Sequence, residues 1–132
     1  MSVKVLIVDD EVDFLDIMAE RMRGRGIDVK TTTSAESAID MVEQEHFDVV
    51  IMDFMMPALG GFKALKMMKK KKADVQIILM TGNVPDEVVL EAKKIGALDV
   101  IEKPADLKTL IEKFKKAKAQ RAKRCKTGSK KK

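Results

Sequence analysis

Five polar side chains of this 132-residue chain stand at the ends of short apolar runs, where they could act together chemically. They are three carboxylates, one hydroxyl and one ammonium: Asp9, Asp10, Asp53, Thr81 and Lys103. If the apolar runs are parallel strands of one sheet, their carboxyl ends meet at one edge and bring these side chains together. Such a set can bind a divalent metal ion and a phosphoryl group.

The three acids favour a metal site over a purely structural cluster. Carboxylates that lie close together in a partly desolvated pocket raise one another's pKa values, so they need a compensating cation. A hard divalent ion such as Mg²⁺ provides that charge and prefers oxygen ligands. The alternative is a set of three buried acids with separate partners, and for these the predicted site offers Lys103 alone.

Lys103 and Thr81 extend this chemistry to phosphoryl transfer, since an ammonium and a hydroxyl can both bind phosphoryl oxygens. The expected nucleophile is a carboxylate, and Asp53, at the end of the central apolar run, is the best placed acceptor for an aspartyl phosphate. The only histidine, His46, falls in the turn before that run and is expected on the surface. Cys125 lies in a basic tail, far from the predicted site.

The apolar runs have the composition of β-strands. Residues 3–8, 48–52 and 75–80 are nearly continuous β-branched or aliphatic stretches, as expected where helices cover both faces of a sheet. Residues 27–31 and 99–101 are more polar and have a weaker pattern, so they suit the edges of the sheet.

Between the strands, apolar residues recur at helical spacing. Thr33 and Glu36 have the spacing of a capping box, Pro85 is suited to opening a helix, and Gly24 and Gly96 stand where helices should end. Alternating strands and helices predict an α/β fold with a doubly wound, five-stranded parallel sheet, for which 2-1-3-4-5 is the commonest order. The helical stripes consist of Phe14, Leu15, Met18 and Met22; Ala35, Ala38, Ile39 and Val42; Phe62, Leu65 and Met68; Val88, Ala92 and Ile95; and Leu107, Leu110, Ile111 and Phe114.

Length and composition fit a single domain. At 45% apolar content the chain can bury a substantial core, in which ten Met residues compensate for scarce aromatic side chains. No apolar run approaches the roughly 20 residues of a membrane span, and no signal peptide opens the chain. A single cysteine cannot form an internal disulfide, so a cytoplasmic location is expected.

The charge is divided unevenly along the chain. Residues 115–132 hold ten Lys or Arg and no acid, which leaves 16 basic and 21 acidic residues in 1–114, a net charge of −5. We therefore expect a domain over residues 1–120 and a basic, disordered tail over 121–132. The tail could contact nucleic acid, an anionic surface or an acidic partner, or it could simply be a solvated helix end or the start of a linker.

Four short motifs stand at the ends of the predicted strands. They are VDDE at 8–11, DFMMP at 53–57 with Gly61, TG at 81–82, and KP at 103–104. In this order they resemble the receiver domain of a two-component response regulator, similar to the chemotaxis regulators, over residues 3 to about 117. The resemblance implies a flavodoxin-like receiver fold with the same sheet order, and a phosphoprotein of a phosphorelay signal transduction system.

The resemblance also implies a role for each acid of the predicted site. Asp53 would accept a phosphoryl group from a phosphohistidine of a sensor histidine kinase. Asp10, Asp53 and the backbone carbonyl of Met55 would bind Mg²⁺ directly, and Asp9 would act through water.

The same resemblance implies how the switch works. Lys103 pairs with the phosphoryl oxygens, and the Thr81 hydroxyl moves toward them after phosphorylation. Pro104 follows the lysine in a peptide bond that is usually cis in the family. Met55 and Asn83 flank the site at positions that should control water access.

Phosphorylation is expected to change the surface formed by the fourth helix, fifth strand and fifth helix. This surface would bind a protein target, and the domain would be a monomer or an activation-dependent dimer.

Two positions depart from the family pattern. Val100 stands where Tyr or Phe is usual, so the coupling between the hydroxyl residue and a buried aromatic ring must be weaker or use other side chains. Gly60 replaces a common Asp in the loop after Asp53, which should loosen that loop. Neither change touches the phosphorylation chemistry.

These features predict a phosphorylation-controlled switch that assists its own phosphorylation and dephosphorylation, not a turnover enzyme. Aspartate-based phosphatases also use acids and Mg²⁺ at a sheet edge, but they place two Asp residues two positions apart in one loop, whereas Asp9 and Asp10 are adjacent and Asp53 is alone. A second alternative is the input half of a DNA-binding transcriptional regulator whose output domain is absent. No DNA-reading motif follows residue 114, so direct reading of nucleic acid is not expected.

Overall fold

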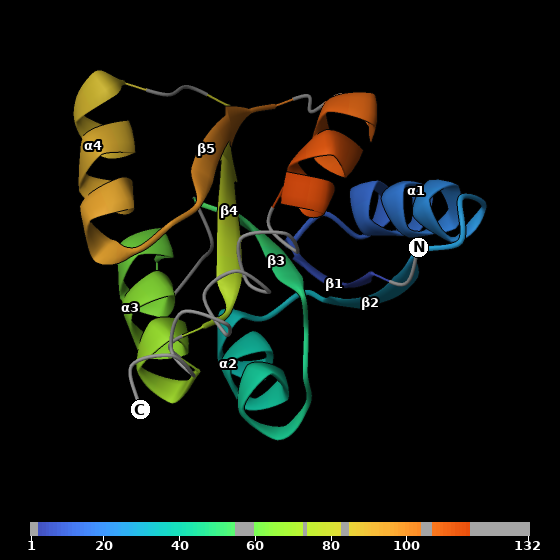
Figure 1. The fold of residues 1–132 in the computed structure, drawn as a ribbon, viewed down its shortest axis with the longest axis horizontal. Helices are drawn as coiled ribbons and strands as arrows, with labels where there is room; N and C mark the ends of the chain where they lie inside the picture. The colour runs from blue at the N-terminus through green and yellow to red at the C-terminus, as the bar shows by residue number, and fades with distance from the viewer. Residues whose placement is uncertain (1–2, 55–59, 73, 83–84, 104–106, 117–132) are drawn as a thin grey trace, which may run out of the picture.

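A five-stranded parallel sheet with helices on both faces forms the domain (Figure 1). The computed structural model describes residues 3–54, 60–72, 74–82, 85–103 and 107–116. The strands occur in the spatial order β2-β1-β3-β4-β5, which confirms the predicted doubly wound α/β topology. Residues 107–116 are also helical. The remaining elements are β1 (Lys4–Val8), α1 (Val12–Arg23), β2 (Asp28–Thr32), α2 (Ala35–Gln44), β3 (Val49–Asp53), α3 (Gly61–Lys71), β4 (Gln76–Thr81), α4 (Asp86–Ile95) and β5 (Asp99–Glu102).

The burial of the strands explains their positions in the sheet. Every residue of β3 and β4 is buried, as their continuous apolar sequences predict for central strands covered on both faces. β2 contains two exposed positions and β5 contains no buried residue, and these two strands form the edges. The parallel register aligns Val5 with Val49 and Val49 with Gln76, so the central strands begin at nearly the same level.

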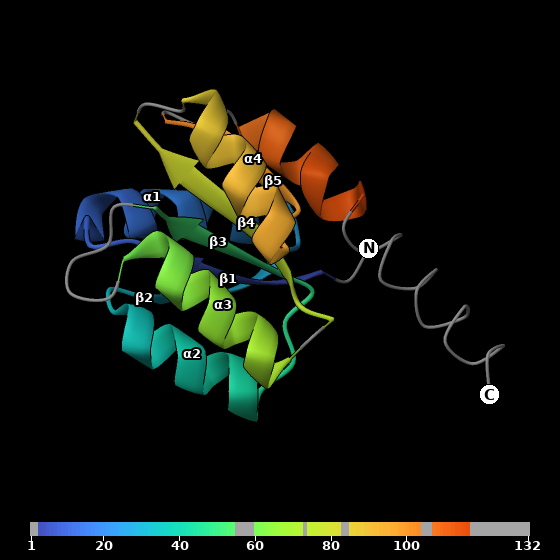
Figure 2. The same ribbon diagram turned by 90° about the vertical axis from the view of Figure 1, so that its left-hand side faces the viewer.

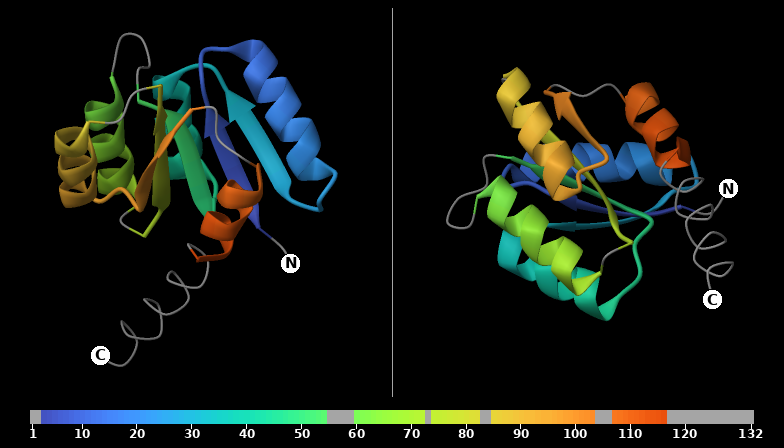
Figure 3. Two further views of the ribbon diagram at one scale, coloured as in Figure 1. Left: turned by 90° about the horizontal axis from the view of Figure 1, so that it is seen from above. Right: turned by 60° about the vertical axis from the view of Figure 1, so that its left-hand side comes forward.

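The helices lie in two layers, one on each face of the sheet (Figure 2). Alternate strand residues point to opposite faces, so Leu6 and Ile77 pack with α2, α3 and α4, whereas Ile7 and Ile78 pack with α1 and residues 107–116. Figure 3 shows these layers from two further directions. Burial of these two apolar faces provides the main driving force for the fold.

The start of α2 differs by one residue from the sequence prediction. Thr33 was expected to cap this helix, but the N-cap is Ser34, whose Oγ accepts a hydrogen bond from the Ser37 backbone N–H at 3.2 Å. Glu36 therefore stands at the second helical position, one short of the place that a capping box requires. A hydroxyl occurs at both 33 and 34, and the pattern alone cannot say which one the helix uses.

The strand ends bring the motif residues to one edge of the sheet. Asp53 and Thr81 are the last residues of β3 and β4, whereas Asp9 and Lys103 directly follow β1 and β5. Within the described residues, no helix is long and apolar enough to cross a membrane. The predicted boundary at residue 120, the tail over 121–132 and Cys125 lie outside the described residues.

Candidate functional site

Backbone hydrogen bonds between neighbouring strand ends hold the site residues in place. The Asp9 N–H donates to the Thr32 carbonyl at 3.2 Å, and the Lys103 N–H donates to the Thr81 carbonyl at 2.8 Å. Beside Asp53, the Phe54 N–H donates to the Met80 carbonyl at 2.7 Å. The polar side chains thus project from backbone that the sheet itself orders, which limits their freedom.

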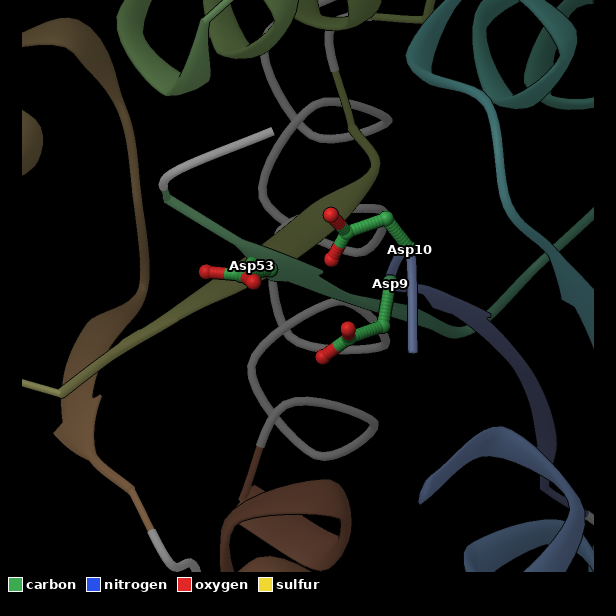
Figure 4. A group of neighbouring side chains, drawn as sticks. All are labelled: Asp9, Asp10 and Asp53. Atoms are coloured by element: carbon green, nitrogen blue, oxygen red, sulfur yellow. The ribbon is translucent and has the colours of Figure 1, made fainter. Parts of the chain in front are cut away.

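Three carboxylates meet at this edge (Figure 4). One oxygen each of Asp9, Asp10 and Asp53 lies within 4.8 Å of the others. The side chain of Asp9 is fully buried and that of Asp53 nearly so, whereas Asp10 is exposed. Oδ1 of Asp9 accepts the Glu11 backbone N–H at 2.9 Å, which limits the rotation of the carboxylate.

Lys103 supplies the positive charge that the acids need. Its Nζ lies 2.7 Å from Oδ2 of Asp9 and 3.2 Å from Oδ2 of Asp53. Burial alone lowers the pKa of Lys103, but the hydrogen bonds and charges of Asp9 and then Asp53 outweigh burial and raise the pKa above its ordinary value. The ammonium therefore stays charged throughout the physiological pH range.

Two contacts of Lys103 were missed by the sequence prediction. Oε1 of Glu11 lies 3.2 Å from Nζ, and the ammonium stands 5.0 Å from the centroid of the Phe14 ring. Glu11 belonged to a quoted motif but had no assigned role, and Phe14 was assigned only to the apolar stripe of its helix. Their position in the sequence could have indicated these contacts. Glu11 directly follows the acidic pair, and Phe14 lies in the first turn of α1, close to the end of β1.

The other predicted residues are placed as follows. Thr81 is 4% exposed at the end of β4, and its backbone is bonded to Lys103. His46 is exposed before β3, with Nε2 3.3 Å from Oδ1 of Asp48, so the expectation of a surface histidine is confirmed. Met55, Asn83 and Pro104, with its peptide bond, lie outside the described residues.

Comparison with known proteins assigns this arrangement to a family. The family model described as "Response regulator receiver domain" matches residues 5–115. The chain belongs to this family. It is a receiver domain of a two-component response regulator, which is not a classical metabolic enzyme. Receiver domains of this family interact with histidine kinases and downstream effectors, and they generally bind Mg²⁺ at an acidic pocket.

Relatives and solved structures agree with the assignment. The response regulator SaeR of Staphylococcus aureus is 35% identical over 107 residues, which is 81% of this chain and 46% of SaeR. The receiver domain thus spans about half the length of the curated relatives that it matches. A CheY-like receiver domain protein from Methanospirillum hungatei JF-1 is 26% identical with a TM-score of 0.87, over 94% of this chain and 99% of that one. The BeF3-activated DrrB receiver domain is 30% identical with a TM-score of 0.78, over 89% and 97%.

The residues of this receiver domain suit a magnesium ion. Three carboxylates at the ends of two strands supply hard oxygen donors, and one of them, Asp10, is exposed to solvent, where a partly hydrated ion can approach. No sulfur or imidazole ligand belongs to the cluster among the described residues, so the donor set disfavours softer metals.

The two departures from the family pattern lie in β5 and at the start of α3. Val100 of β5 is partly buried and packs on the sheet face covered by α3 and α4, in register with Leu79. Gly60 has a φ of 81°, a conformation that suits glycine, and it is the N-cap of α3. The adjoining residues 55–59 lie outside the described residues, so the expected loosening of their loop stays a prediction.

Proposed function

We propose that Asp53 of this receiver domain accepts a phosphoryl group from the phosphohistidine of a sensor histidine kinase in the cytoplasm, and that phosphorylation changes its binding to a protein partner. The main support is the position of Lys103, whose ammonium lies between the buried acid Asp9 and the acceptor Asp53. A cation held there can neutralise charge that develops on the transferring group.

In the proposed reaction, an oxygen of the Asp53 carboxylate attacks phosphorus, and the bond between phosphorus and the histidine nitrogen breaks. The product is an aspartyl phosphate, and the imidazole leaves with its electron pair. Lys103 binds a phosphoryl oxygen, and the Thr81 hydroxyl donates a hydrogen bond to another. In this proposal the domain also assists its own dephosphorylation, in which water hydrolyses the acyl phosphate and releases inorganic phosphate.

Asp9, Asp10, Asp53 and the backbone carbonyl of Met55 are the proposed Mg²⁺ ligands, with Asp9 acting through water. When bound, the ion would supply positive charge to the phosphoryl oxygens. The close carboxylates support this assignment because their mutual repulsion is relieved by a divalent cation.

The direct test is to incubate the protein with Mg²⁺ and acetyl phosphate and to measure the intact mass. We expect one added phosphoryl group in the wild type and none in Asp53→Asn. Asp40→Asn is the matched control, because it removes an exposed aspartate of α2 and should be phosphorylated normally. A phosphoryl adduct that persists in Asp53→Asn would reject Asp53 as the acceptor.

We place the readout on α4, β5 and residues 107–116. The support is that Asp99 of β5 contacts Lys93 of α4 and Lys113, so these three elements are joined by one side chain. Leu90, 62% exposed on α4, offers apolar contact area there.

Amide NMR with and without beryllofluoride should show shifts on this surface despite Val100, and light scattering would reveal a dimer. Shifts confined to the phosphorylation site would reject this readout.

A second proposal is that the chain is the input half of a DNA-binding transcriptional regulator. Its support is that the match covers only 46% of the SaeR length. A natural reading frame that continues past Lys132 into a DNA-binding domain would establish this proposal, and a stop codon there would reject it.

A further inference from the structure

Carboxylates engage every N–H group of the Lys103 ammonium. Nζ donates to Oδ2 of Asp9 at 2.7 Å, to Oδ2 of Asp53 at 3.2 Å and to Oε1 of Glu11 at 3.2 Å. A lysine ammonium has three N–H donors and no acceptor, so these three hydrogen bonds use its full capacity. A phosphoryl oxygen that binds Lys103 must therefore take over one of them.

The bond to Asp9 is the least able to yield. It is the shortest of the three, and the Asp9 side chain has no exposed surface. The other oxygen of this carboxylate accepts the Glu11 backbone N–H, which keeps the group in place. Removal of the ammonium would leave a buried negative charge without its counter-charge, which is strongly unfavourable. We therefore expect Lys103 to keep this bond when a phosphoryl group arrives.

The bond to Asp53 should also last until transfer. The Asp53 side chain is only 10% exposed, so water cannot easily replace the ammonium beside it. As the proposed acceptor, Asp53 stays a charged carboxylate until its oxygen bonds to phosphorus. Its attraction for Lys103 weakens only as the neutral acyl group forms, which is too late to help the phosphoryl group to bind.

Glu11 is the partner that can leave. Its side chain is 66% exposed, so water can solvate the carboxylate once it moves away from Lys103. Helix α1 does not need it either, because Glu11 is the N-cap residue but its side chain makes no capping hydrogen bond. Among the hydrogen bonds found in the described part of the chain, the one that this carboxylate makes is to Lys103.

Lys103 does not depend on Glu11 for its position. The ammonium stands 5.0 Å from the centroid of the Phe14 ring, at a distance where the ring attracts a cation. This attraction uses the face of the ring and occupies no particular N–H group. Asp9 and Phe14 can therefore hold the ammonium at the site after Glu11 has moved, and one N–H becomes available to a new acceptor.

We propose that Glu11 slows the phosphorylation of Asp53, because its carboxylate occupies the Lys103 N–H that the incoming phosphoryl oxygen requires. The carboxylate must turn into solvent before the phosphoryl group can be bound. This inference rests on the proposed phosphorylation of Asp53 and identifies a residue that sets its rate. Glu11 acts through Lys103, so it is a positioning residue and not a catalytic one.

The test is the rate of phosphorylation by acetyl phosphate with Mg²⁺, measured as intact mass against time. In this reaction an Asp53 oxygen bonds to phosphorus, and acetate leaves with the electron pair of the broken bond. Glu11→Gln should react about two- to fivefold faster than the wild type, as expected if a largely exposed ion pair no longer has to be broken. Thermal melts verify that each variant is folded.

Two further variants separate contact from charge. Glu11→Asp keeps the negative charge but is one methylene shorter, so it should lose the contact with Lys103 and also react faster. Asp13→Asn is the matched control, because it removes one negative charge from an exposed position in the first turn of α1. Asp13 has no contact with Lys103 among those found in the described residues, so this variant should react at the wild-type rate.

The dependence on Lys103 gives the sharpest readout. In a Lys103→Ala background, Glu11→Gln should no longer change the rate, since the ammonium for which Glu11 competes is absent. Simple repulsion of the anionic phosphodonor by Glu11 would instead persist in this background. The double variant, both single variants and the wild type are compared under the same conditions.

Several outcomes would overturn the inference. They are a rate for Glu11→Gln that is equal to or below that of Asp13→Asn, an acceleration in Glu11→Gln without one in Glu11→Asp, and an equal acceleration with and without Lys103. A wild type that is phosphorylated on Asp53 at the same rate as the Glu11 variants would reject this inference alone. A wild type that gains no phosphoryl group would reject the proposed function as well.

Discussion

The Lys103 ammonium lies 2.7 Å from the carboxylate of Asp9, a residue with no exposed surface. The same ammonium lies 3.2 Å from the proposed phosphoryl acceptor Asp53. One lysine therefore stabilises both an acid proposed to act in metal binding and the acid proposed to react. Its removal should affect the stability of the domain and phosphoryl transfer by separate routes, and these can be measured apart.

The first prediction concerns stability. Lys103→Ala should lower the free energy of unfolding in EDTA by about 1–3 kcal/mol, because two buried carboxylates lose their counter-charge. Added Mg²⁺ should recover part of this loss, since the ion supplies positive charge in place of the ammonium. Urea denaturation with EDTA and with Mg²⁺ measures both effects, and Lys66→Ala on the exposed surface of α3 is the control. Identical losses with and without Mg²⁺ would contradict this role for the lysine.

The second prediction concerns phosphoryl transfer. Lys103→Ala should keep most of its Mg²⁺ affinity but should accept phosphoryl groups from acetyl phosphate about 10²-fold more slowly, because the developing charge loses a positioned cation. Calorimetry reports the metal affinity, and intact mass against time reports the transfer. Equal transfer rates in the variant and the wild type would reject the proposed contact with the phosphoryl group.

The third prediction concerns metal binding by Asp10. Because its side chain is exposed, Asp10→Asn should fold normally, yet it should weaken Mg²⁺ binding at least about tenfold. The increase in thermal stability that Mg²⁺ gives should shrink in parallel. Asp16→Asn removes an exposed acid from the middle of α1 and should keep the wild-type affinity. If both variants bind Mg²⁺ equally well, Asp10 is not a ligand.

The fourth prediction concerns the close approach of Gly61 to Phe54. A Cβ on Gly61 would lie 2.5 Å from the Phe54 ring carbon Cδ1 and 2.7 Å from the Phe54 carbonyl oxygen. Gly61→Ala should thus destabilise the domain by about 1–3 kcal/mol and slow phosphorylation of the adjacent Asp53. Around Gly82 a Cβ meets nothing within 4 Å, so Gly82→Ala should change stability by less than about 0.5 kcal/mol. Similar urea midpoints for the two variants would show that the backbone near Gly61 can move to accept a Cβ without loss of stability.

The fifth prediction concerns pH. Burial raises the pKa of Asp99, but hydrogen bonds from Lys113 and the Val100 N–H, with the charges of Lys113 and Lys93, outweigh it and lower the pKa below its ordinary value of 3.8. The stability that Asp99 contributes is therefore fully present above pH 3.8 and is lost as the pH falls through the lowered value. At neutral pH, Asp99→Asn should cost about 0.5–1 kcal/mol, since the contacts are partly exposed to solvent.

The difference in free energy of unfolding between Asp99→Asn and the wild type should disappear in strong acid. Urea denaturation from neutral pH to well below 3.8 measures it, with Glu91→Gln, an exposed residue of α4, as the control. A cost that stays constant over this range would show that the charge of Asp99 is not responsible for it.

Much of the fold could be predicted because local pattern and tertiary position agree. Continuous apolar runs such as 48–52 and 75–80 are stable only where both faces are covered, so they had to be central strands. The polar residues of 27–31 and 99–101 similarly indicated the edges. Once the strands were parallel, Asp9, Asp53, Thr81 and Lys103 had to come to one edge, because the carboxyl ends of parallel strands share it.

Other features depend on distances that no local pattern contains. Glu11 and Phe14 contact Lys103 because its long side chain reaches from the end of β5 across the strand ends to the turn after β1. The choice of Ser34 over Thr33 depends on where the backbone of α2 begins. The sequence by itself determined which side chains reach the reactive edge of the sheet. The tertiary structure alone decided which of their neighbours hold them there, since such contacts require the helices to pack.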